Sequence, residues 1–306
     1  MANVDLHNSD CIAGMASLDP ECVDLTVTSI PFEELFTYSG KLEDVGNNGS
    51  TVNIREGRFA LNMRFVIDAL FRVHKPGTNV CIHIQQLLAW KNQHGFIGRR
   101  DFRGAIIDLF SAGGFVFSGE AAIPKNPQAM AQRLNLHSLM FITGKSNSTM
   151  LAPAPNDYLL IFQKPGEVAQ RVRCLYDAEK NPEGWVTTEE WIKWASGCWD
   201  DINEVDVLDG WRAARESDEE KHVCPLQLEV IRRPIKLYTN PISIQPDVVV
   251  LDPFMGIGST AYIAIEQDRN AIGFELKESY FDQSLRNIEI ARQNANRTSL
   301  FSEVSA

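Results

Sequence analysis

The sequence has neither a long apolar run nor a secretory leader. None of its apolar runs approaches the roughly 20 residues that a membrane-spanning helix needs. Residues 1–10 carry acidic side chains and lack the apolar core of a signal peptide. We therefore expect no membrane partner and a cytoplasmic location. Internal repeats and low-complexity tracts are also missing, which argues against a solenoid or a largely disordered chain.

Cysteine is scarce and scattered. The six cysteines lie at positions 11, 22, 81, 174, 198 and 224, and no two of them form a Cys-x-x-Cys pair. This spacing excludes a zinc ribbon and a disulfide framework. We expect no metal site and a reducing, intracellular setting.

Positive charge is in deficit. The chain has 29 lysines and arginines against 40 aspartates and glutamates, so its formal net charge is −11. A basic surface of the histone type is therefore excluded, and a nucleic acid would have to meet a local basic patch on an acidic body. The two clearly basic stretches are Lys91–Arg103 and residues 121–150.

Apolar runs and helical stripes alternate along most of the chain. The expected strands are Cys22–Ser29, Asn79–Ile84, Phe115–Ile123, Tyr158–Gln163, Val248–Leu251 and Ala271–Phe274. The expected helices are Arg58–Arg72, Phe102–Phe110, Leu226–Tyr238, Ser259–Gln267 and Ser279–Asn294. This alternation predicts an α/β fold, with a mostly parallel sheet and helices on both faces.

Residues 165–221 differ in character from the rest. Trp185, Trp191, Trp194, Trp199 and Trp211 lie there, and Asp200–Glu220 holds nine acidic and two basic residues. We interpret this stretch as an insertion in one domain assembled from residues 1–164 and 222–306. Its tryptophans are expected to pack the insertion or a subunit contact rather than to stack on bases.

A glycine-rich turn follows the strand at 248–251. Residues 252–260 read Asp-Pro-Phe-Met-Gly-Ile-Gly-Ser-Thr, and a helix comes next. A strand, a Gly-x-Gly turn and a helix bring backbone N–H groups and a bare turn against a ligand. Glu275, at the end of the following strand, can accept hydrogen bonds from two ribose hydroxyls. The bland alternative is a tight strand–helix turn; NAD is less favoured because position 261 is alanine rather than the third glycine.

These residues resemble the S-adenosylmethionine motif Asp-Pro-Phe-x-Gly-x-Gly-Thr of DNA amino-methyltransferases. The resemblance implies a Rossmann-like methyltransferase fold, a mostly parallel sheet with an antiparallel strand, and S-adenosylmethionine as the cofactor. It also implies a cofactor site that includes Asp252, Pro253, Phe254, Gly256, Gly258, Ser259 and Glu275.

Ser29-Ile30-Pro31-Phe32 follows an expected strand and resembles the same family's catalytic loop, (Asp/Asn/Ser)-Pro-Pro-(Tyr/Phe/Trp). The lone pair of an exocyclic amino group is delocalised into the base. The Ser29 hydroxyl and the Ile30 carbonyl can accept its hydrogens, which draws the nitrogen toward sp³ geometry, and Phe32 can stack on a flipped base. Ile30 replaces the family's first proline, which makes the loop less rigid and puts catalytic efficiency in doubt.

The order of the motifs resembles the permuted group called class β, in which the catalytic loop precedes the cofactor motif and the target-recognition segment lies between them. Asn8-Ser9-Asp10-Cys11 resembles this family's Asn-x-Asp-Cys segment, in which the aspartate reads the adenine of the cofactor. Residues 72–77 and 221–226 resemble two further family segments. The second would place His222 and Pro225 beside the methionine part of the cofactor, although His222 can equally be a helix cap and Asp10 a turn residue.

The resemblance covers about two-thirds of the chain and is strongest to phage and prophage enzymes, which implies a bacterial or phage-infected cell. It implies double-stranded DNA as substrate, a target-recognition or oligomerisation role for residues 165–221, and a homodimer or higher homo-oligomer. No nuclease signature stands out, so we expect a stand-alone modifier rather than a fused restriction enzyme. Candidate DNA contacts, each of which could equally lie on a solvated charged face, are Lys91, Arg99, Arg100, Arg103, Lys125 and Arg133.

Different residues of the catalytic loop favour different methylated bases. Serine at the first position of the catalytic loop is typical of N4-cytosine enzymes. Phe32 at the fourth position and the phage-like resemblance favour N6-adenine, which is our prediction. The alternatives are an N4-cytosine enzyme, an RNA or protein methyltransferase, an NAD oxidoreductase without an evident proton donor, and a catalytically weak DNA-binding or assembly protein with Ile30 as the trace of lost activity.

Overall fold

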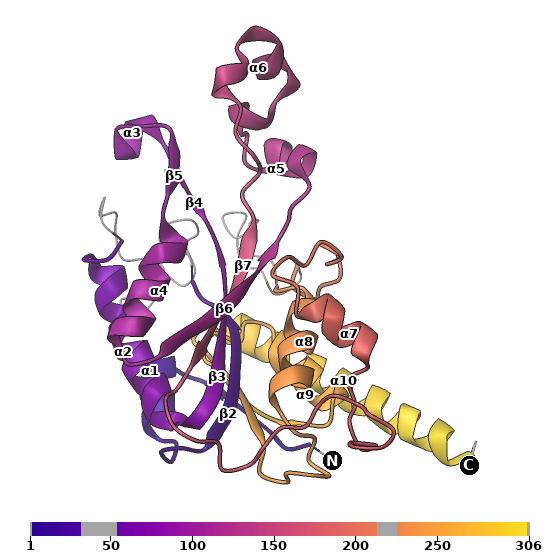
Figure 1. Ribbon diagram of the computed structural model, residues 1–306. Coiled ribbons are helices and arrows are strands. Elements are labelled where there is room, and N and C mark those ends of the chain that lie inside the picture. Colours follow the sequence, from indigo (N-terminus) through magenta and orange to yellow (C-terminus); the bar gives the residue numbers. More distant parts are fainter. Residues whose placement is uncertain (1, 32–53, 213, 215–224, 305–306) are drawn as a thin grey trace.

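A mixed β-sheet forms the centre of the protein (Figure 1). The computed structural model describes residues 2–31, 54–212, 214 and 225–304. The strands of its large sheet are β1 (Val4–Asn8), β2 (Val23–Ser29), β3 (His74–Gln85), β6 (Val116–Ile123), β7 (Asp157–Gln163), β8 (Val249–Asp252) and β9 (Asn270–Glu275).

The strands lie in the order β1-β9-β8-β2-β3-β7-β6. Neighbours pair in parallel except where β7 lies antiparallel to both β3 and β6. The chain order reverses between β8 and β2, and ligands of open α/β sheets bind beyond the carboxyl ends of the strands at such a point. The predicted mostly parallel sheet with an antiparallel strand is confirmed.

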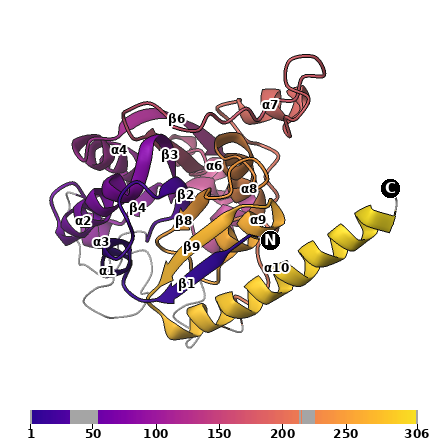
Figure 2. The ribbon, with the colours of Figure 1, turned by 90° about the horizontal axis from the view of Figure 1, so that it is seen from below.

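Helices cover both faces of the sheet. On one face α1 (Cys11–Ala16), α2 (Arg58–Val73) and α4 (Phe102–Ala112) pack into one hydrophobic core. On the other face α8 (Leu228–Tyr238), α9 (Ser259–Glu266) and α10 (Glu278–Val304) pack into a second core. The C-terminal turns of α10 extend away from the body (Figure 2).

The burial pattern explains the local structure. Helix α2 buries Phe59, Met63, Val66, Ile67 and Leu70, whose spacing places them on one face. Strand β2 is buried on both sides over six consecutive residues, as expected of a central parallel strand.

The predicted strands and helices are all present, with shifted ends. Strand β3 begins at His74, directly after α2, so Lys75-Pro76-Gly77 lies in a strand rather than in a loop. Strand β1 was not predicted, because its half-exposed pattern lacks a long apolar run. Its pairing with β9 along its whole length makes it the edge of the sheet.

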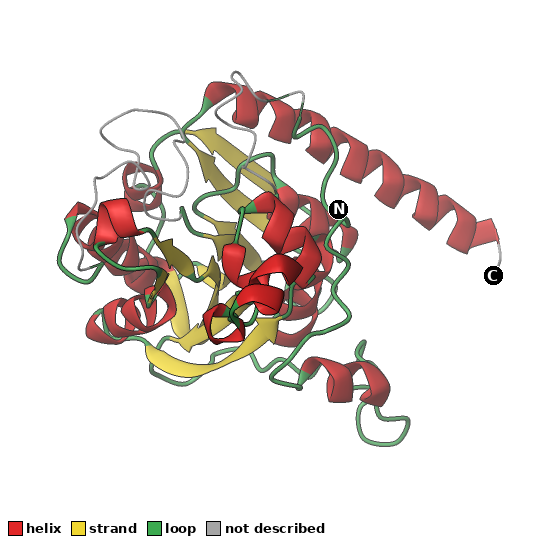
Figure 3. Ribbon diagram, turned by 90° about the horizontal axis from the view of Figure 1, so that it is seen from above, coloured by secondary structure: helices red, strands yellow, loops and turns green. Residues whose placement is uncertain are grey.

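Two excursions of the chain extend beyond the carboxyl ends of β3 and β6. They lie at the top of Figure 1 and on the side that faces the viewer in Figure 3. The first arm, residues 86–101, contains the ribbon of β4 (Leu87–Ala89) and β5 (Gly98–Arg100) with α3 (Lys91–His94) at its tip. The second arm, residues 124–156, connects β6 to β7. It contains α5 (Pro127–Arg133), η2 (His137–Leu139), α6 (Phe141–Ser146) and η3 (Ser148–Met150).

The described part of the predicted insertion lies against the body. It contains α7 (Thr188–Trp194), and Trp185 Nε1 donates to the Lys236 carbonyl of α8 at 2.8 Å. Trp199 is buried in the second core, and the guanidinium carbon of the buried Arg233 lies 4.8 Å from its ring centroid. The expected packing role is confirmed for Trp194 and Trp199, which are both buried.

Candidate functional site

A pocket of about 270 Å³ opens at the carboxyl ends of the parallel strands. Strands β1, β9, β8, β2 and β3 all end at this edge, and the antiparallel β7 begins there. The pocket brings together all the predicted cofactor and catalytic residues of the described chain except Gly258. They are Asp10, Cys11, Ser29, Ile30, Pro31, Pro225, Asp252, Pro253, Phe254, Gly256, Ser259 and Glu275. Phe32 and His222 lie outside the described residues.

Asp252 ties the cofactor turn to the catalytic strand. Its Oδ1 accepts hydrogen bonds from the Thr28 hydroxyl at 2.6 Å and from the Phe254 N–H at 3.0 Å. Its Oδ2 accepts from the Thr260 hydroxyl at 2.7 Å. Burial raises the pKa of Asp252, and these donors only partly offset that effect. Asp252 therefore orders the turn, and its two oxygens already accept three donors.

The glycine turn leaves room for a ligand to approach its backbone closely. Gly256 has φ +54°, and a Cβ there would meet no protein atom within 4 Å. The Gly256 N–H donates to Glu275 Oε2 at 2.9 Å, and the Lys277 N–H donates to Glu275 Oε1 at 2.8 Å. Gly258, with φ +86°, is the N-cap of α9, and a Cβ there would lie 3.0 Å from the Ser284 Cβ. Gly258 therefore packs against Ser284 of α10.

Asp10 both faces the pocket and caps a helix. Its Oδ1 accepts from the Ile12 and Ala13 N–H groups at 3.0 and 2.9 Å, and its neighbour Cys11 is buried. Burial, followed by the charge of Asp10, raises the pKa of the Cys11 thiol, so it stays protonated. Of the two roles weighed for Asp10, the turn role is present, and its place in the pocket leaves room for the other.

Ser29 ends β2 beside a histidine of the next strand. The Ser29 hydroxyl lies 3.0 Å from His83 Nδ1, and His83 Nε2 lies 3.1 Å from Asp157 Oδ2. Lys125 Nζ approaches the same Asp157 oxygen at 2.8 Å. The strand register pairs Ser29 with His83, whereas Gln85 pairs with Asp157. The catalytic serine thus stands at the head of a chain of polar side chains.

The predicted DNA contacts fall into different settings. Lys91 and Arg99 lie on the first arm, Arg99 donating to the Pro153 carbonyl of the second arm, and Arg133 lies on α5 at the pocket. Arg100 is buried, and Arg103 pairs with Glu120 at 2.6 Å.

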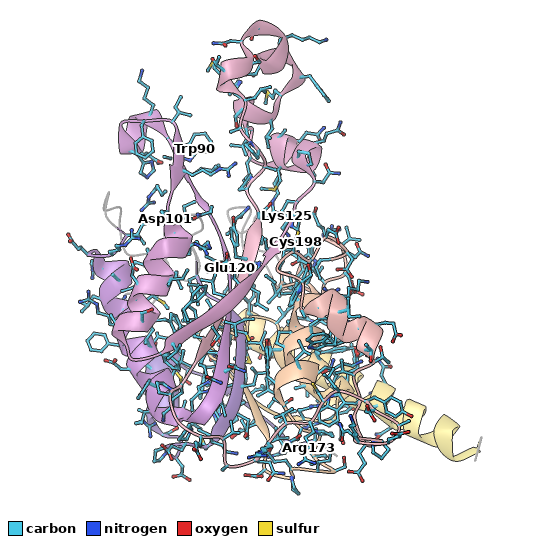
Figure 4. All side chains as sticks on the ribbon, in the orientation of Figure 1. Trp90, Asp101, Glu120, Lys125, Arg173 and Cys198 are labelled. Atoms are coloured by element: carbon cyan, nitrogen blue, oxygen red, sulfur yellow. The ribbon has the colours of Figure 1, made fainter. Side chains whose placement is uncertain are left out.

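Lys125, a candidate DNA contact in the sequence, lies in a buried ion pair. The side chain is only 7% exposed, and Asp157 pairs with its charge at the base of the second arm (Figure 4). The sequence marked it only as one basic residue in an acid-free stretch.

Several pocket residues were missed. His83, Gln227, Trp211, Lys277 and Tyr280 all line the cavity. Gln227 directly follows residues 221–226, a segment that the resemblance already marked. The others carry no motif, because their position depends on strand register and helix packing.

The pocket fits the nucleoside cofactor that the resemblance implies. Gly256 leaves open space where any larger residue would place a Cβ. Phe254, Phe274 and Tyr280 offer apolar surface to a flat ring. Gln227 Oε1 is buried and has no hydrogen-bond partner among the residues that the structure describes, so it can accept from a ligand's amino group.

Neither a metal cluster nor a membrane-spanning helix is found in the described residues. No group of three or more histidine, cysteine, aspartate or glutamate side chains is placed there to hold a metal ion. No helix of that part of the chain is both long and apolar enough to cross a membrane.

Comparisons with known proteins agree with this geometry. A family model described as a DNA methylase of the N6 and N4 type matches residues 23–286. The type II methyltransferase M.BglI of Bacillus subtilis is 37% identical over 134 residues, which is 44% of this chain and 30% of that protein. M.MjaI of Methanocaldococcus jannaschii is 27% identical over 216 residues, 70% of this chain and 62% of that protein. The match thus spans less than two thirds of each relative.

Solved structures show the same fold. A DNA modification methylase of Thermus thermophilus, crystallised with S-adenosylmethionine, superposes with a TM-score of 0.66 at 20% identity, over 94% of this chain and 93% of that one. The cytosine-N4-specific PvuII DNA methyltransferase gives a TM-score of 0.59 at 17% identity, over 97% of this chain and 93% of that one.

Proposed function

Because the chain belongs to the N6/N4 DNA methylase family, we propose that it methylates the exocyclic amino group of a base flipped out of double-stranded DNA. One observation carries the proposal. The catalytic strand and the cofactor turn, 224 positions apart at Thr28 and Asp252, are hydrogen-bonded to each other and open into one pocket. Each motif alone is also compatible with an ordinary turn after a strand, but an ordinary turn does not explain why both motifs line one cavity.

S-adenosylmethionine is the cofactor, and it supplies an electrophilic methyl group on a sulfonium. Glu275 would hold the ribose hydroxyls, since its carboxylate lines the pocket and the Gly256 and Lys277 N–H groups fix its two oxygens in place. The bare backbone at Gly256 would let the cofactor approach the turn. Gln227 would accept from the amino group of the methionine part.

Ser29 and Ile30 would prepare the nucleophile. Both line the pocket, so the serine hydroxyl and the isoleucine carbonyl can accept the two hydrogens of an amino group. These bonds weaken the delocalisation of the nitrogen lone pair into the base. Replacement of the family's first proline by Ile30 keeps that carbonyl, and the Ile30 side chain is buried in the first core, which anchors the loop.

For the base, we propose cytosine N4 as the first candidate. Ser29 supports it, because serine at this position is typical of N4-cytosine enzymes and Ser29 lies in the pocket. Adenine N6, the prediction from the sequence, is the second candidate. It rests on Phe32, which lies outside the described residues, and on the phage-like resemblance.

The arms are the proposed DNA contact. They rise over the edge where the pocket opens, and the second arm has no acidic residue although the whole chain carries a net charge of −11. Lys91, Arg99 and Arg133 would contact phosphates there. This assigns recognition to the arms, and leaves residues 165–221, first expected to recognise the target, with the alternative role of oligomerisation. The homo-oligomer and a separate restriction partner stay predictions.

Mass spectrometry tests the proposed function. Unmethylated DNA would be incubated with the protein and S-adenosylmethionine, then digested to nucleosides, with Ser29→Ala as the control. We expect N4-methylcytosine as the product. Its yield should fall at least about tenfold in the variant, because one hydrogen bond to the target amino group is lost. N6-methyladenine would keep the function and change the base. Neither product, with the cofactor bound, would point to an RNA or protein substrate or to a DNA-binding protein without activity.

A further inference from the structure

Behind Ser29 lies a line of buried side chains to which the proposed methylation assigns no role. The Ser29 hydroxyl is 3.0 Å from His83 Nδ1, and His83 Nε2 is 3.1 Å from Asp157 Oδ2. His83 and Asp157 are 7% and 6% exposed, although they sit at the pocket edge. Three side chains from adjacent strands thus connect the pocket to a buried carboxylate.

The carboxylate determines which nitrogen of His83 carries the proton. Burial would raise the pKa of Asp157, but the hydrogen bond and charge of His83 and the charge of Lys125 outweigh it and lower the pKa. Asp157 is therefore ionised and can only accept. A neutral His83 then donates from Nε2, which leaves Nδ1 as an acceptor for the Ser29 hydroxyl.

This arrangement fixes the direction in which Ser29 acts. With its hydrogen directed at His83 Nδ1, the Ser29 oxygen presents lone pairs to the pocket. A lone pair is what the N–H of an amino group requires. Were the hydrogen bond reversed, the hydroxyl would offer the target nitrogen a competing donor.

Resting on the proposed function, we propose that His83, oriented by Asp157, is the positioning residue that accepts through Ser29 the proton lost by the target amino group. As the nitrogen–methyl bond forms and the methyl–sulfur bond breaks, an N–H bond of the base breaks and an O–H bond forms on Ser29. The original Ser29 proton moves to His83 Nδ1. The positive charge of the sulfonium is thereby transferred to an imidazolium beside Asp157.

The charged surroundings of His83 come from two sides. Asp157 begins β7, and Lys125 reaches the same carboxylate from the base of the second arm. Arg133, Glu204 and Asp252 line the same pocket. The imidazole and the Lys125 ammonium thus share one carboxylate oxygen, Asp157 Oδ2.

Another histidine of the same strand provides the structural comparison. His74 is buried between the Thr26 and Thr78 hydroxyls at 2.7 and 2.9 Å, with no carboxylate beside it among the described residues. Burial, and then the charge of Lys164, lowers its pKa to about 3, so it stays neutral. His74→Asn is the matched control for the loss of a buried histidine from β3.

The kinetic test uses single-turnover methylation of duplex DNA by the full chain. His83→Asn keeps a side-chain acceptor near Nδ1 but cannot take a proton, so its rate should fall about 100-fold, the lower end for positioned proton transfer. The wild-type rate should also drop at acidic pH, and this limb should vanish in His83→Asn. His74→Asn should keep both the rate and the limb, and calorimetry should give all three proteins similar cofactor affinity.

A measurement that does not depend on activity complements it. Nitrogen-15 NMR of histidine-labelled protein near pH 8 should show one imidazole with a protonated Nε2 and a bare Nδ1, whose Nδ1 signal moves in Ser29→Ala. Asp157→Asn should reverse that tautomer. This result needs no folded His83 variant.

The outcomes separate the two proposals. Active wild-type protein with an unchanged rate and acid limb in His83→Asn, or a protonated Nδ1 in the spectrum, would overturn the role of His83 and leave the methylation intact. Wild-type protein that shows the expected tautomer but methylates no base would overturn the proposed function and, with it, the proton path.

Discussion

At the scale of the residue, alanine substitutions at two glycines distinguish the effect of backbone strain on stability from an effect on ligand binding. Gly256 and Gly95 have φ of +54° and +80°, and a Cβ at either would meet no atom within 4 Å. Alanine at either position should cost about 1 kcal/mol of stability through left-handed strain. Only Gly256→Ala should also weaken S-adenosylmethionine binding, because Gly256 lines the pocket and Gly95 ends α3 on the first arm.

Thermal unfolding and titration calorimetry measure these two effects separately. Gly95→Ala is the matched control, since it carries the same kind of strain far from the cofactor turn. Equal cofactor affinity in both variants would show that the open space at Gly256 is not where the ligand lies.

At the scale of the element, the arms are expected to carry the contact with DNA. Lys91→Glu combined with Arg133→Glu changes the charge of both arms, and both side chains are exposed. The double variant should bind DNA more weakly, and the slope of log affinity against log salt should fall by about 2, because two phosphate contacts are lost. Fluorescence anisotropy over a salt series measures both quantities.

The control changes the net charge by the same amount in another place. Arg171→Glu with Arg173→Glu alters two exposed arginines of the predicted insertion, and Arg173 lies at the opposite end of the molecule (Figure 4). This variant should bind like the wild type. A loss confined to it would return target recognition to residues 165–221, as first predicted from the sequence.

At the scale of the whole molecule, the pocket couples ligand binding to global stability. Asp10, Ser29, Pro225, Asp252 and Glu275 line one cavity although they come from both ends of the chain. A ligand of this pocket therefore binds only the folded state. S-adenosylmethionine at 100 times its dissociation constant should add about 2.7 kcal/mol to the free energy of unfolding.

A thermal scan with two ligands tests that coupling. S-adenosylmethionine should raise the unfolding temperature by several degrees, whereas NAD should leave it unchanged, and Gly256→Ala should lose most of the effect. A rise with NAD alone would revive the interpretation of the glycine turn as part of an oxidoreductase.

The amino-acid sequence by itself determined the local chemistry. The periodicity of the apolar residues predicted the strands of the large sheet apart from β1, and the helices on its faces apart from α1. The pleat and the helical turn set that pattern residue by residue. The Asp252–Ser259 turn and the Ser29–Pro31 loop were readable for the same reason, because a tight turn or a strand end restricts the residues at that position.

Only the tertiary structure decided which distant side chains meet. The alignment of β2, β3 and β7 places His83 and Asp157 behind Ser29, and a shift of one residue would turn each side chain to the other face. It also buries Lys125 against Asp157, although its local sequence is that of an exposed basic stretch. Such contacts form between strands and loops far apart in the chain, where spacing along the sequence carries no information about register.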